Sequence, residues 1–400
     1  AVNVPVPAWS ANPVALTVAQ STPGASDILW EVSDTTPGFS ELGHVLQKPV
    51  FGILRDGTWV MLVGNGYDSA SKKAQLFVVN ALTGALIKII DTGAGSASAP
   101  NGLGGVTVVL DGQQRIVSAY AGDLLGNMWK FDFSSSTQSA WGVAFGGYPL
   151  FKAWNSAAQT EPFTAAPAYL NHPLGGVMLL AGTGKMFEST DLSDTRERTL
   201  YGVWDKVPVG AASGDSTSIL ATNAALVTQS TSAVPISGTV GGTYYAGSSN
   251  AVDYGTGAAG GSKRGWRLPL TNQSGQRLIY APWLAVGRVV FDSIAPGDTA
   301  QSCSISKGKT YQFVLDPMTG APSSSGPTLD TNGNLVIDSS DSATAAVVQG
   351  DIGGPAVGVQ PGSNPSLINL VNANTKPVLV QGDKNTVGRN WRQIINPPAL

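Results

Sequence analysis

FVVNALTG (residues 77–84) and FVLDPMTG (residues 313–320) are two copies of one pattern, although they lie far apart in the chain. Each copy is an apolar run that ends in Asn80 or Asp316 and then turns through Thr-Gly. Asn and Asp side chains accept backbone N–H bonds in turns, and Gly tolerates a positive φ. The pair therefore predicts a strand-and-turn unit that the fold uses more than once.

A wider template surrounds this pair: an apolar strand, often after Pro, then a strand ending in Gly, then a strand ending in Asn or Asp. Its five copies are KPVFGIL (48–54), TWVMLVGNG (58–66) and QLFVVNALTG (75–84); GGVTVVL (104–110), RIVSAYAGD (115–123) and NMWKFDF (127–133); APAYL (166–170), GVMLLAGTG (176–184) and TLYGVWD (199–205); APWLAVGRVVFDS (281–293) and YQFVLDPMTG (311–320); GPAVGV (354–359), KPVLVQGD (376–383) and GRNWRQI (388–394). One four-stranded propeller blade takes about 40–50 residues. The sequence therefore predicts an all-β fold, a β-propeller of six to seven quinoprotein-like blades with loop insertions. The alternative is an open β-sandwich array.

We expect one β-propeller domain over residues 1–400. The long interval between the marks Asp205 and Asp316 leaves room for one unmarked blade, and its insertion-rich stretch 206–275 predicts long loops or edge strands at the rim. ILWEVSD (28–34) resembles the fourth strand of a blade, so the chain begins inside a blade. GRNWRQI (388–394) is then expected to supply a partner strand and close the ring, which removes exposed sheet edges.

Composition excludes several classes of function. Charged residues make up 12% and the net charge is −3, without a basic stripe, so we expect no nucleic-acid partner. No apolar run approaches the roughly 20 residues of a transmembrane segment. Only His44 and His172 are histidines, which argues against zinc sites and Ser-His-Asp chemistry. Cys303 is the single cysteine and is either a small buried residue or paired outside this chain. Because the chain starts at Ala1 instead of Met, we expect the C-terminal fragment of a larger protein.

DTNGNLVID (330–338) places oxygen-bearing side chains on alternate positions. Calcium prefers six to eight oxygen ligands, and the EF-hand loop supplies them from positions 1, 3, 5, 9 and the backbone carbonyl of position 7. The matching residues are Asp330, Asn332, Asn334, Asp338 and, at position 7, Val336. The spacing predicts a calcium loop over 330–341, within an interblade insertion, that folds when the ion binds.

Two departures from the EF-hand pattern weaken this loop. Leu335 stands where that pattern has Gly, and neutral Asn334 stands where an acid is common, so we expect a dissociation constant on the order of 10⁻⁶–10⁻⁴ M. Asp341 occupies position 12, and the sequence leaves open whether it binds the ion, binds through water or points away. The alternative for the whole stretch is an Asx-rich turn, because Asp, Asn and Gly favour turns anyway.

Several longer blocks resemble one known family. FGILRDGTWVMLVGNGYDS (51–69), YAGDLLGNMWKFDF (120–133), TAAPAYLNHP (164–173), GTGKMFESTDLSDT (182–195), KRGWRLPL (263–270) and SGQRL (274–278) look like the C-terminal domain of the PilY1 family of type IV pilus biogenesis and adhesion proteins. The resemblance implies a modified β-propeller with one calcium loop at the same five positions. It also implies that an N-terminal region, often similar to a von Willebrand A module, is missing here.

The resemblance further implies an exported protein at the bacterial cell surface, either the pilus tip or the outer membrane. Its expected role is to support pilus extension, oppose retraction and aid twitching motility and surface attachment. Pilins or minor pilins are the expected partners, with host or abiotic surfaces as further ones. Two alternatives remain at this stage. A quinone-dependent dehydrogenase-like propeller would need a cofactor pocket and a catalytic base that the sequence does not supply, and a carbohydrate-binding propeller would need exposed aromatic platforms.

Overall fold

The computed structural model describes residues 14–16, 28–214, 225–237, 243–255, 261–285, 287–297, 308–334, 336–351, 356–360, 367–371 and 378–381. Within these ranges the regular structure is β-strand, apart from short 3₁₀ helices at Gln138–Ala140, Phe145–Gly147 and Ser189–Ser193. None of the helices in the described ranges has the length and apolarity needed to cross a bilayer. The prediction of an all-β fold is confirmed.

The first two repeats form meanders whose strands pair in antiparallel order. The first contains β3 (Val50–Leu54), β4 (Trp59–Gly64), β5 (Lys73–Asn80) and β6 (Leu86–Gly95). The second contains β7 (Leu103–Leu110), β8 (Arg115–Asp123) and β9 (Asn127–Asp132), with β10 (Gly142–Val143) and β11 (Phe151–Lys152) both paired to β9. A short parallel contact between β3 and β8 joins the two meanders, which are called the first and second sheets below, into one hydrogen-bonded set of nine strands.

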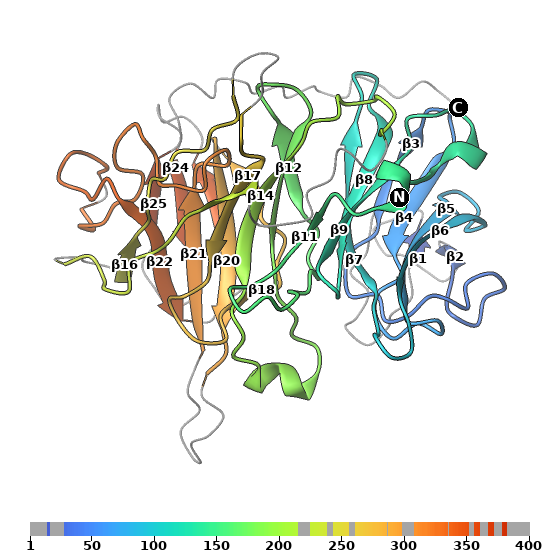
Figure 1. Cartoon of the computed structure of the whole chain (residues 1–400), viewed down its shortest axis with the longest axis horizontal. Helices are drawn as coiled ribbons and strands as arrows, with labels where there is room; N and C mark the ends of the chain where they lie inside the picture. Colours follow the sequence, from blue (N-terminus) through green and yellow to red (C-terminus); the bar gives the residue numbers. More distant parts are fainter. Residues whose placement is uncertain are drawn as a thin grey trace.

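The remaining repeats continue the same arrangement. The third sheet contains β12 (Ala168–Asn171), β13 (Val177–Gly182), β14 (Thr199–Asp205), β17 (Gly265–Pro269) and β15 (Val227–Thr228). The fourth contains β18 (Arg277–Leu278), β19 (Trp283–Ala285), β20 (Arg288–Ala295), β21 (Lys309–Leu315), β22 (Ala345–Asp351) and β16 (Thr243–Ala246). Two smaller sheets are β23 (Ala356–Gln360), β24 (Leu367–Val371) and β25 (Val378–Gln381), and β1 (Val14–Leu16) with β2 (Ile28–Glu31). Figure 1 shows the larger sheets side by side, from β3–β6 on the right to β20–β22 on the left.

The structure corrects two details of the predicted repeats. The stretch 206–275 forms no separate blade among its described residues, because β15 and β17 join the third sheet while β16 joins the fourth as an edge strand beside β22. The run 281–293 contains two strands instead of one, since β19 and β20 pair as a hairpin that turns at Gly287, where φ is +78°. Cys303 and GRNWRQI (388–394) lie outside the described residues, so ring closure and the blade count stay predictions.

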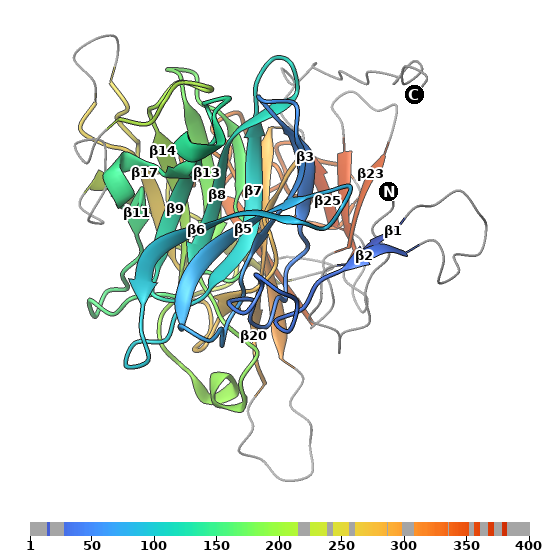
Figure 2. The same cartoon turned by 90° about the vertical axis from the view of Figure 1, so that its right-hand side faces the viewer.

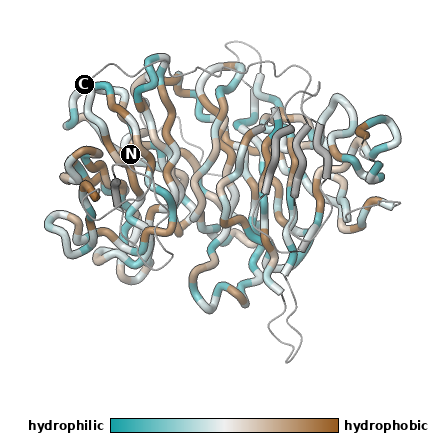
Figure 3. Tube along the Cα trace, turned by 180° about the vertical axis from the view of Figure 1, so that it is seen from behind, coloured by the Kyte–Doolittle hydropathy of each residue, from teal (hydrophilic) through white to brown (hydrophobic). Residues whose placement is uncertain are grey.

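The hydrophobic cores lie between neighbouring sheets. Leu54, Leu62, Ile116 and Trp129 belong to the core shared by the first two meanders. Similar cores fill the space between the second and third sheets and between the third and fourth sheets. In Figure 3 the apolar colour follows the strands and the polar colour gathers in the connecting loops. A single sheet cannot cover its own apolar faces, so each repeat buries them against the sheets on either side.

A glycine at the end of the second strand lets adjacent blades approach closely. A Cβ atom on Gly64 would lie 2.3 Å from the carbonyl oxygen of Gly104, and one on Gly122 would lie 2.2 Å from the Cβ of Phe163. Only glycine fits such close contacts without a shift of the neighbouring atoms. A buried polar residue follows each glycine: the Asn65 side-chain oxygen accepts the N–H of Leu103 in the next blade at 3.1 Å, and Asp123 accepts several N–H bonds.

The turns that end the runs 77–84 and 313–320 have the predicted geometry. The Asn80 Oδ1 atom accepts the N–H of Thr83 at 3.0 Å, and the Asp316 Oδ1 atom accepts the N–H of Thr319 at 2.9 Å. Gly84 and Gly320 follow, with φ of +71° and +68°. Both turns are confirmed, since each combines the capping side chain with the left-handed glycine that the sequence predicted.

An indole ring covers each of these turns. Trp30 on β2 donates its Nε1–H to the carbonyl of Ala81 at 3.1 Å, and Trp266 on β17 donates to the carbonyl of Pro317 at 3.0 Å. Because β17 is the last strand of the preceding blade, the identical contact assigns β2 the same place before the first meander. This equivalence supports the interpretation of residues 28–34 as a fourth strand. Figure 2 shows β2, with its antiparallel partner β1, at the side of the first blade.

Candidate functional site

The predicted calcium loop lies between β21 and β22, after the turn at Asp316. Its first residue is fixed to the sheet, because the Tyr244 hydroxyl of edge strand β16 donates to the backbone carbonyl of Asp330 at 2.9 Å. Leu329 just before it is fully buried in the core cluster that also contains Tyr244. Burial raises the pKa of Tyr244 to about 12, and the negative charges of Asp330 and Asp341 add to the effect. The loop therefore starts from a rigid base at the sheet edge.

The side chains at alternate positions bind the loop's own backbone. Each of four oxygens accepts an N–H two or three residues further on: Asp330 from Gly333 at 2.7 Å, Asn332 from Asn334 at 3.0 Å, Asn334 from Val336 at 2.8 Å and Asp338 from Ser340 at 2.8 Å. These are consecutive Asx turns, the local geometry that the alternative interpretation expected. Consecutive Asx turns and a metal loop are compatible, because a side-chain oxygen has more than one lone pair.

The predicted ligands differ in exposure. Asp330 is buried at the base, whereas Asn334, Val336 and Asp338 are exposed, with 53% of Val336 accessible. Leu335, which replaces the EF-hand glycine, lies outside the described residues. Hydrogen bonds from Ser340 lower the pKa of Asp338 and keep its carboxylate ionised. The exposed half of the loop is thus open to an ion from solvent.

The donor set of the loop is made of oxygen alone. In the described ranges, no three His, Cys, Asp or Glu side chains are grouped closely enough to hold a metal, so a site here depends on amide and carbonyl oxygens as well as carboxylates. Hard oxygen ligands of mixed type suit calcium and do not suit zinc or copper. The residues present therefore fit the ion that the spacing predicts.

Asp341, which the sequence left without a role, lies at the neck of the loop and is 7% exposed. Its Oδ1 atom accepts the N–H groups of Thr331 at 2.7 Å and Asn332 at 3.2 Å, and also the Thr331 hydroxyl at 3.2 Å. Its Oδ2 atom accepts the N–H of Asp338 at 3.1 Å. The carboxylate thus connects the two ends of the loop.

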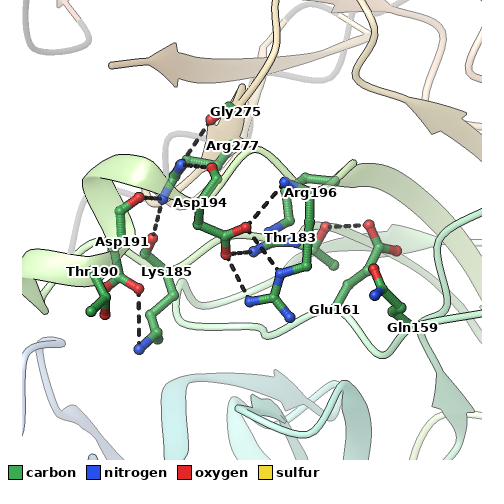
Figure 4. A network of polar contacts seen from close by, with 12 residues as sticks. Gln159, Glu161, Thr183, Lys185, Thr190, Asp191, Asp194, Arg196, Gly275 and Arg277 are labelled. Atoms are coloured by element: carbon green, nitrogen blue, oxygen red, sulfur yellow. Dashed lines mark hydrogen bonds and ion pairs between the residues drawn. The ribbon is translucent and has the colours of Figure 1, made fainter. Parts of the chain in front are cut away.

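A second polar cluster, shown in Figure 4, holds the long connection between β13 and β14. The buried Arg277 guanidinium donates to the carbonyls of Lys185 at 3.0 Å, Asp191 at 2.6 Å and Asp194 at 2.6 Å. The carboxylate of Asp191 pairs with Lys185, and that of Asp194 pairs with Arg196 and Arg198. These ion pairs explain the cluster as an anchor for the connection.

Glu161 is a buried acid that no sequence pattern indicated. The hydroxyls of Thr183, Thr199 and Tyr201 donate to its carboxylate at 3.2, 3.1 and 2.6 Å. Burial raises the pKa of Glu161 to about 7, against the lowering effect of these hydrogen bonds and of Arg198. Its partners come from distant segments, so spacing in the sequence carried no signal.

A buried ion pair also crosses from the second sheet to the third. Lys130 on β9 donates to the Oδ2 atom of Asp205 on β14 at 2.8 Å, and the Tyr120 hydroxyl donates to the same atom at 2.6 Å. The side chains of Lys130 and Asp205 are 5% and 1% exposed. Such a pair holds two sheets in one register, because an unpaired charge at this depth is costly.

One cavity of about 530 Å³ bears on the enzyme alternative. It lies between the β7–β8 and β12–β13 turns, and its ionisable lining side chains are Asp111 and His172. Asp111 forms an ion pair with Arg115 at 2.8 Å, and the Nδ1 atom of His172 accepts the N–H of Leu174 at 3.1 Å. Asp111 is held in its ion pair, and His172 is the one ionisable lining side chain with an atom, Nε2, that has no hydrogen-bond partner among the described residues. A single imidazole of this kind adds little support for a catalytic site.

Comparison with known proteins relates the chain to one family. A family model described as the PilY1 beta-propeller domain matches residues 11–233. The type IV pilus biogenesis factor PilY1 of Pseudomonas aeruginosa strain PAO1 is 30% identical over 93% of this chain, which covers 34% of that relative. A PilY1 homolog of Xylella fastidiosa is 31% identical over 75% of this chain, which covers 20% of it.

A solved structure agrees with the sequence relatives. The crystal structure of the Pseudomonas aeruginosa PilY1 C-terminal domain matches with a TM-score of 0.73 and 27% identity, covering 89% of this chain and 75% of that one. The chain spans about a third or less of the length of the curated relatives described above. The predicted resemblance and the predicted β-propeller class are both confirmed. This chain belongs to the PilY1 β-propeller family, whose named relatives are type IV pilus biogenesis factors.

Proposed function

We propose that this protein is a calcium-regulated factor in type IV pilus biogenesis, exported to the bacterial cell surface. Membership of the PilY1 family supports the link to pili. The single observation that supports calcium control is the loop over 330–341, which presents oxygen ligands beside a rigid sheet edge. In this proposal the domain binds pilins or minor pilins, supports extension against retraction, and aids twitching motility and attachment to host or abiotic surfaces.

Calcium would be held by the carboxylates of Asp330 and Asp338, the side-chain carbonyl oxygens of Asn332 and Asn334, and the backbone carbonyl of Val336. The bound ion supplies positive charge that offsets the repulsion between the loop's carboxylates. The protein's own contribution is the base: Tyr244 fixes the carbonyl of Asp330, so the exposed half of the loop rearranges against a fixed half. A change in the exposed half alters the surface beside β16 and β22, at the left of Figure 1, and a partner can read that change.

Isothermal titration with calcium tests the ion. The wild-type domain is expected to bind with a dissociation constant on the order of 10⁻⁶–10⁻⁴ M, and Asp338→Ala is expected to abolish or strongly weaken binding. Asp34→Asn, which changes an exposed carboxylate on a different part of the chain, serves as the control. Unchanged calcium affinity in Asp338→Ala would remove the assignment.

Pull-down with purified pilins and minor pilins tests the regulation. Capture is expected to differ between buffer with calcium and buffer with a chelator, and Asp338→Ala is expected to behave as the chelated protein does in both buffers. Equal capture of pilins by the wild type in the two buffers would exclude calcium control while leaving pilin binding intact. No capture in either buffer would exclude the partner.

A further inference from the structure

Asp341 differs from the other oxygen-bearing residues of the loop in what it contacts. Asp330, Asn332, Asn334 and Asp338 each bind a backbone N–H within three residues of themselves. Asp341 instead reaches back across the loop to Thr331 and Asn332, about ten residues earlier in the chain. It is therefore the carboxylate whose hydrogen bonds determine how the loop closes.

Most of the hydrogen-bonding capacity of Asp341 is used within the loop. A carboxylate offers about four lone-pair sites on its two oxygens. Asp341 accepts four bonds: the N–H and the hydroxyl of Thr331, the N–H of Asn332 and the N–H of Asp338. The N–H of Ser342 donates to the Thr331 hydroxyl oxygen at 3.0 Å, which fixes that hydroxyl toward Asp341. Oδ1 accepts three of these bonds and Oδ2 accepts the fourth, so the negative charge of the carboxylate is already directed at donors of the loop, and the side chain is only 7% exposed.

These contacts lie beside the first and last predicted ligands. Thr331 and Asn332 follow Asp330 directly, and the N–H that Oδ2 accepts belongs to Asp338 itself. The side-chain amide of Asn332 adds a bond to the Ser340 hydroxyl at 2.8 Å. The Asp341 carboxylate thus bridges the N–H groups of Thr331 and Asn332 at the start of the loop and the N–H group of Asp338 at its end.

We infer that Asp341 is a positioning residue that closes the loop at its neck, and that it is not a ligand of the ion. The inference rests on the proposed calcium site, which it deepens: the position that supplies a bidentate ligand in an EF-hand here supplies the acceptor for loop N–H groups. Groups that orient metal ligands without touching the metal change affinity by about 10–100-fold when they are replaced. We expect a loss of that size for calcium in Asp341→Asn, which keeps the shape and removes one acceptor and the charge.

Two measurements separate a positioning role from a ligand role. Hydrogen exchange of the metal-free protein, followed by mass spectrometry, reads the peptide that contains Thr331, Asn332 and Asp338. It is expected to exchange faster in Asp341→Asn than in the wild type, whereas Asp34→Asn leaves it unchanged. Luminescence lifetimes of bound Tb³⁺ in H₂O and D₂O count the water molecules on the ion, and this number is expected to stay the same in Asp341→Asn.

Each outcome decides the question. Unchanged exchange in metal-free Asp341→Asn, or an additional water on Tb³⁺, would overturn the positioning role. If the wild type binds neither calcium nor Tb³⁺, the proposed calcium site fails, while the exchange measurement on the metal-free protein still tests loop closure. If Asp341→Asn does not fold, Thr331→Val removes the hydroxyl that Asp341 accepts and keeps the backbone bonds, and a smaller increase in exchange is expected.

Discussion

Glu161 makes the domain lose stability as the pH rises toward neutrality, which is the reverse of the usual effect of a carboxylate. Burial raises its pKa from 4.5 to about 7, so the folded state binds the proton more tightly than the unfolded state does. Stability falls with pH wherever the folded state binds more protons. The unfolding free energy is therefore expected to decline between about pH 4.5 and pH 7, by up to about 3 kcal/mol at ~1.4 kcal/mol per pH unit.

Glu161→Gln isolates this contribution, because glutamine keeps the shape and cannot ionise. Urea denaturation of wild type and variant at half-unit steps from pH 4.5 to pH 8 gives the difference in unfolding free energy, in which all other titrating groups cancel. The difference is expected to move in favour of the variant as the pH rises, and to level off above about pH 7. Asp34→Asn, with its exposed carboxylate, is expected to give a flat difference over the same range. A flat difference for Glu161→Gln as well would refute the reasoning.

Three further predictions follow from contacts described above. Gly320→Ala is expected to lower the unfolding free energy by more than about 1–2 kcal/mol, because Gly320 has a left-handed φ of +68° and an added Cβ atom would lie 2.3 Å from the Trp266 ring. Gly142→Ala is the control, since open space surrounds Gly142, and equal urea midpoints for the two variants would contradict the argument. Lys130→Met is expected to lower the unfolding free energy by about 3–5 kcal/mol, because it leaves Asp205 buried without its cation. The double variant Lys130→Met with Asp205→Leu is expected to lose clearly less than the sum of the two single variants, and additive losses in denaturation experiments would show that the pair is not coupled. Burial and the charge of Lys206 lower the pKa of His172 to about 4, so the stability that its neutral form contributes is complete above about pH 6.5 and is lost toward pH 4. Thermal melts of His172→Gln should lack this part of the pH dependence, and identical pH profiles for the variant and the wild type would refute the prediction.

The order of the strands could be predicted because each blade repeats local chemistry. Asn80 with Gly84 and Asp316 with Gly320 mark turns that form wherever these residues occur together, so the sequence alone located them. The segment 206–275 could not be assigned in the same way. Its strands β16 and β17 pair with sheets that follow and precede them, and pairing between distant segments leaves no local pattern.

In the candidate loop, the alternating oxygen-bearing residues could be named from the sequence, whereas the way the loop closes could not. Alternate oxygens are visible in DTNGNLVID, whereas the role of Asp341 depends on which N–H groups point toward it once the chain has folded back. Trp30 and Trp266 illustrate the same limit. Their residue type indicates burial, but the bond of each indole to a particular carbonyl follows only from the docking of one blade against the next.

The contact between the Trp30 indole and the turn at Ala81 has a mechanical consequence for a domain in a family of pilus proteins. Tension applied to the chain ahead of Ile28 reaches β2 before it reaches any strand of the first meander. It must then pull an indole, together with its hydrogen bond, from above Gly84, whose missing side chain makes room for the ring. Load entering from that end is therefore resisted by the pairing of β1 with β2 and by this contact between blades before it reaches the strands of the first meander.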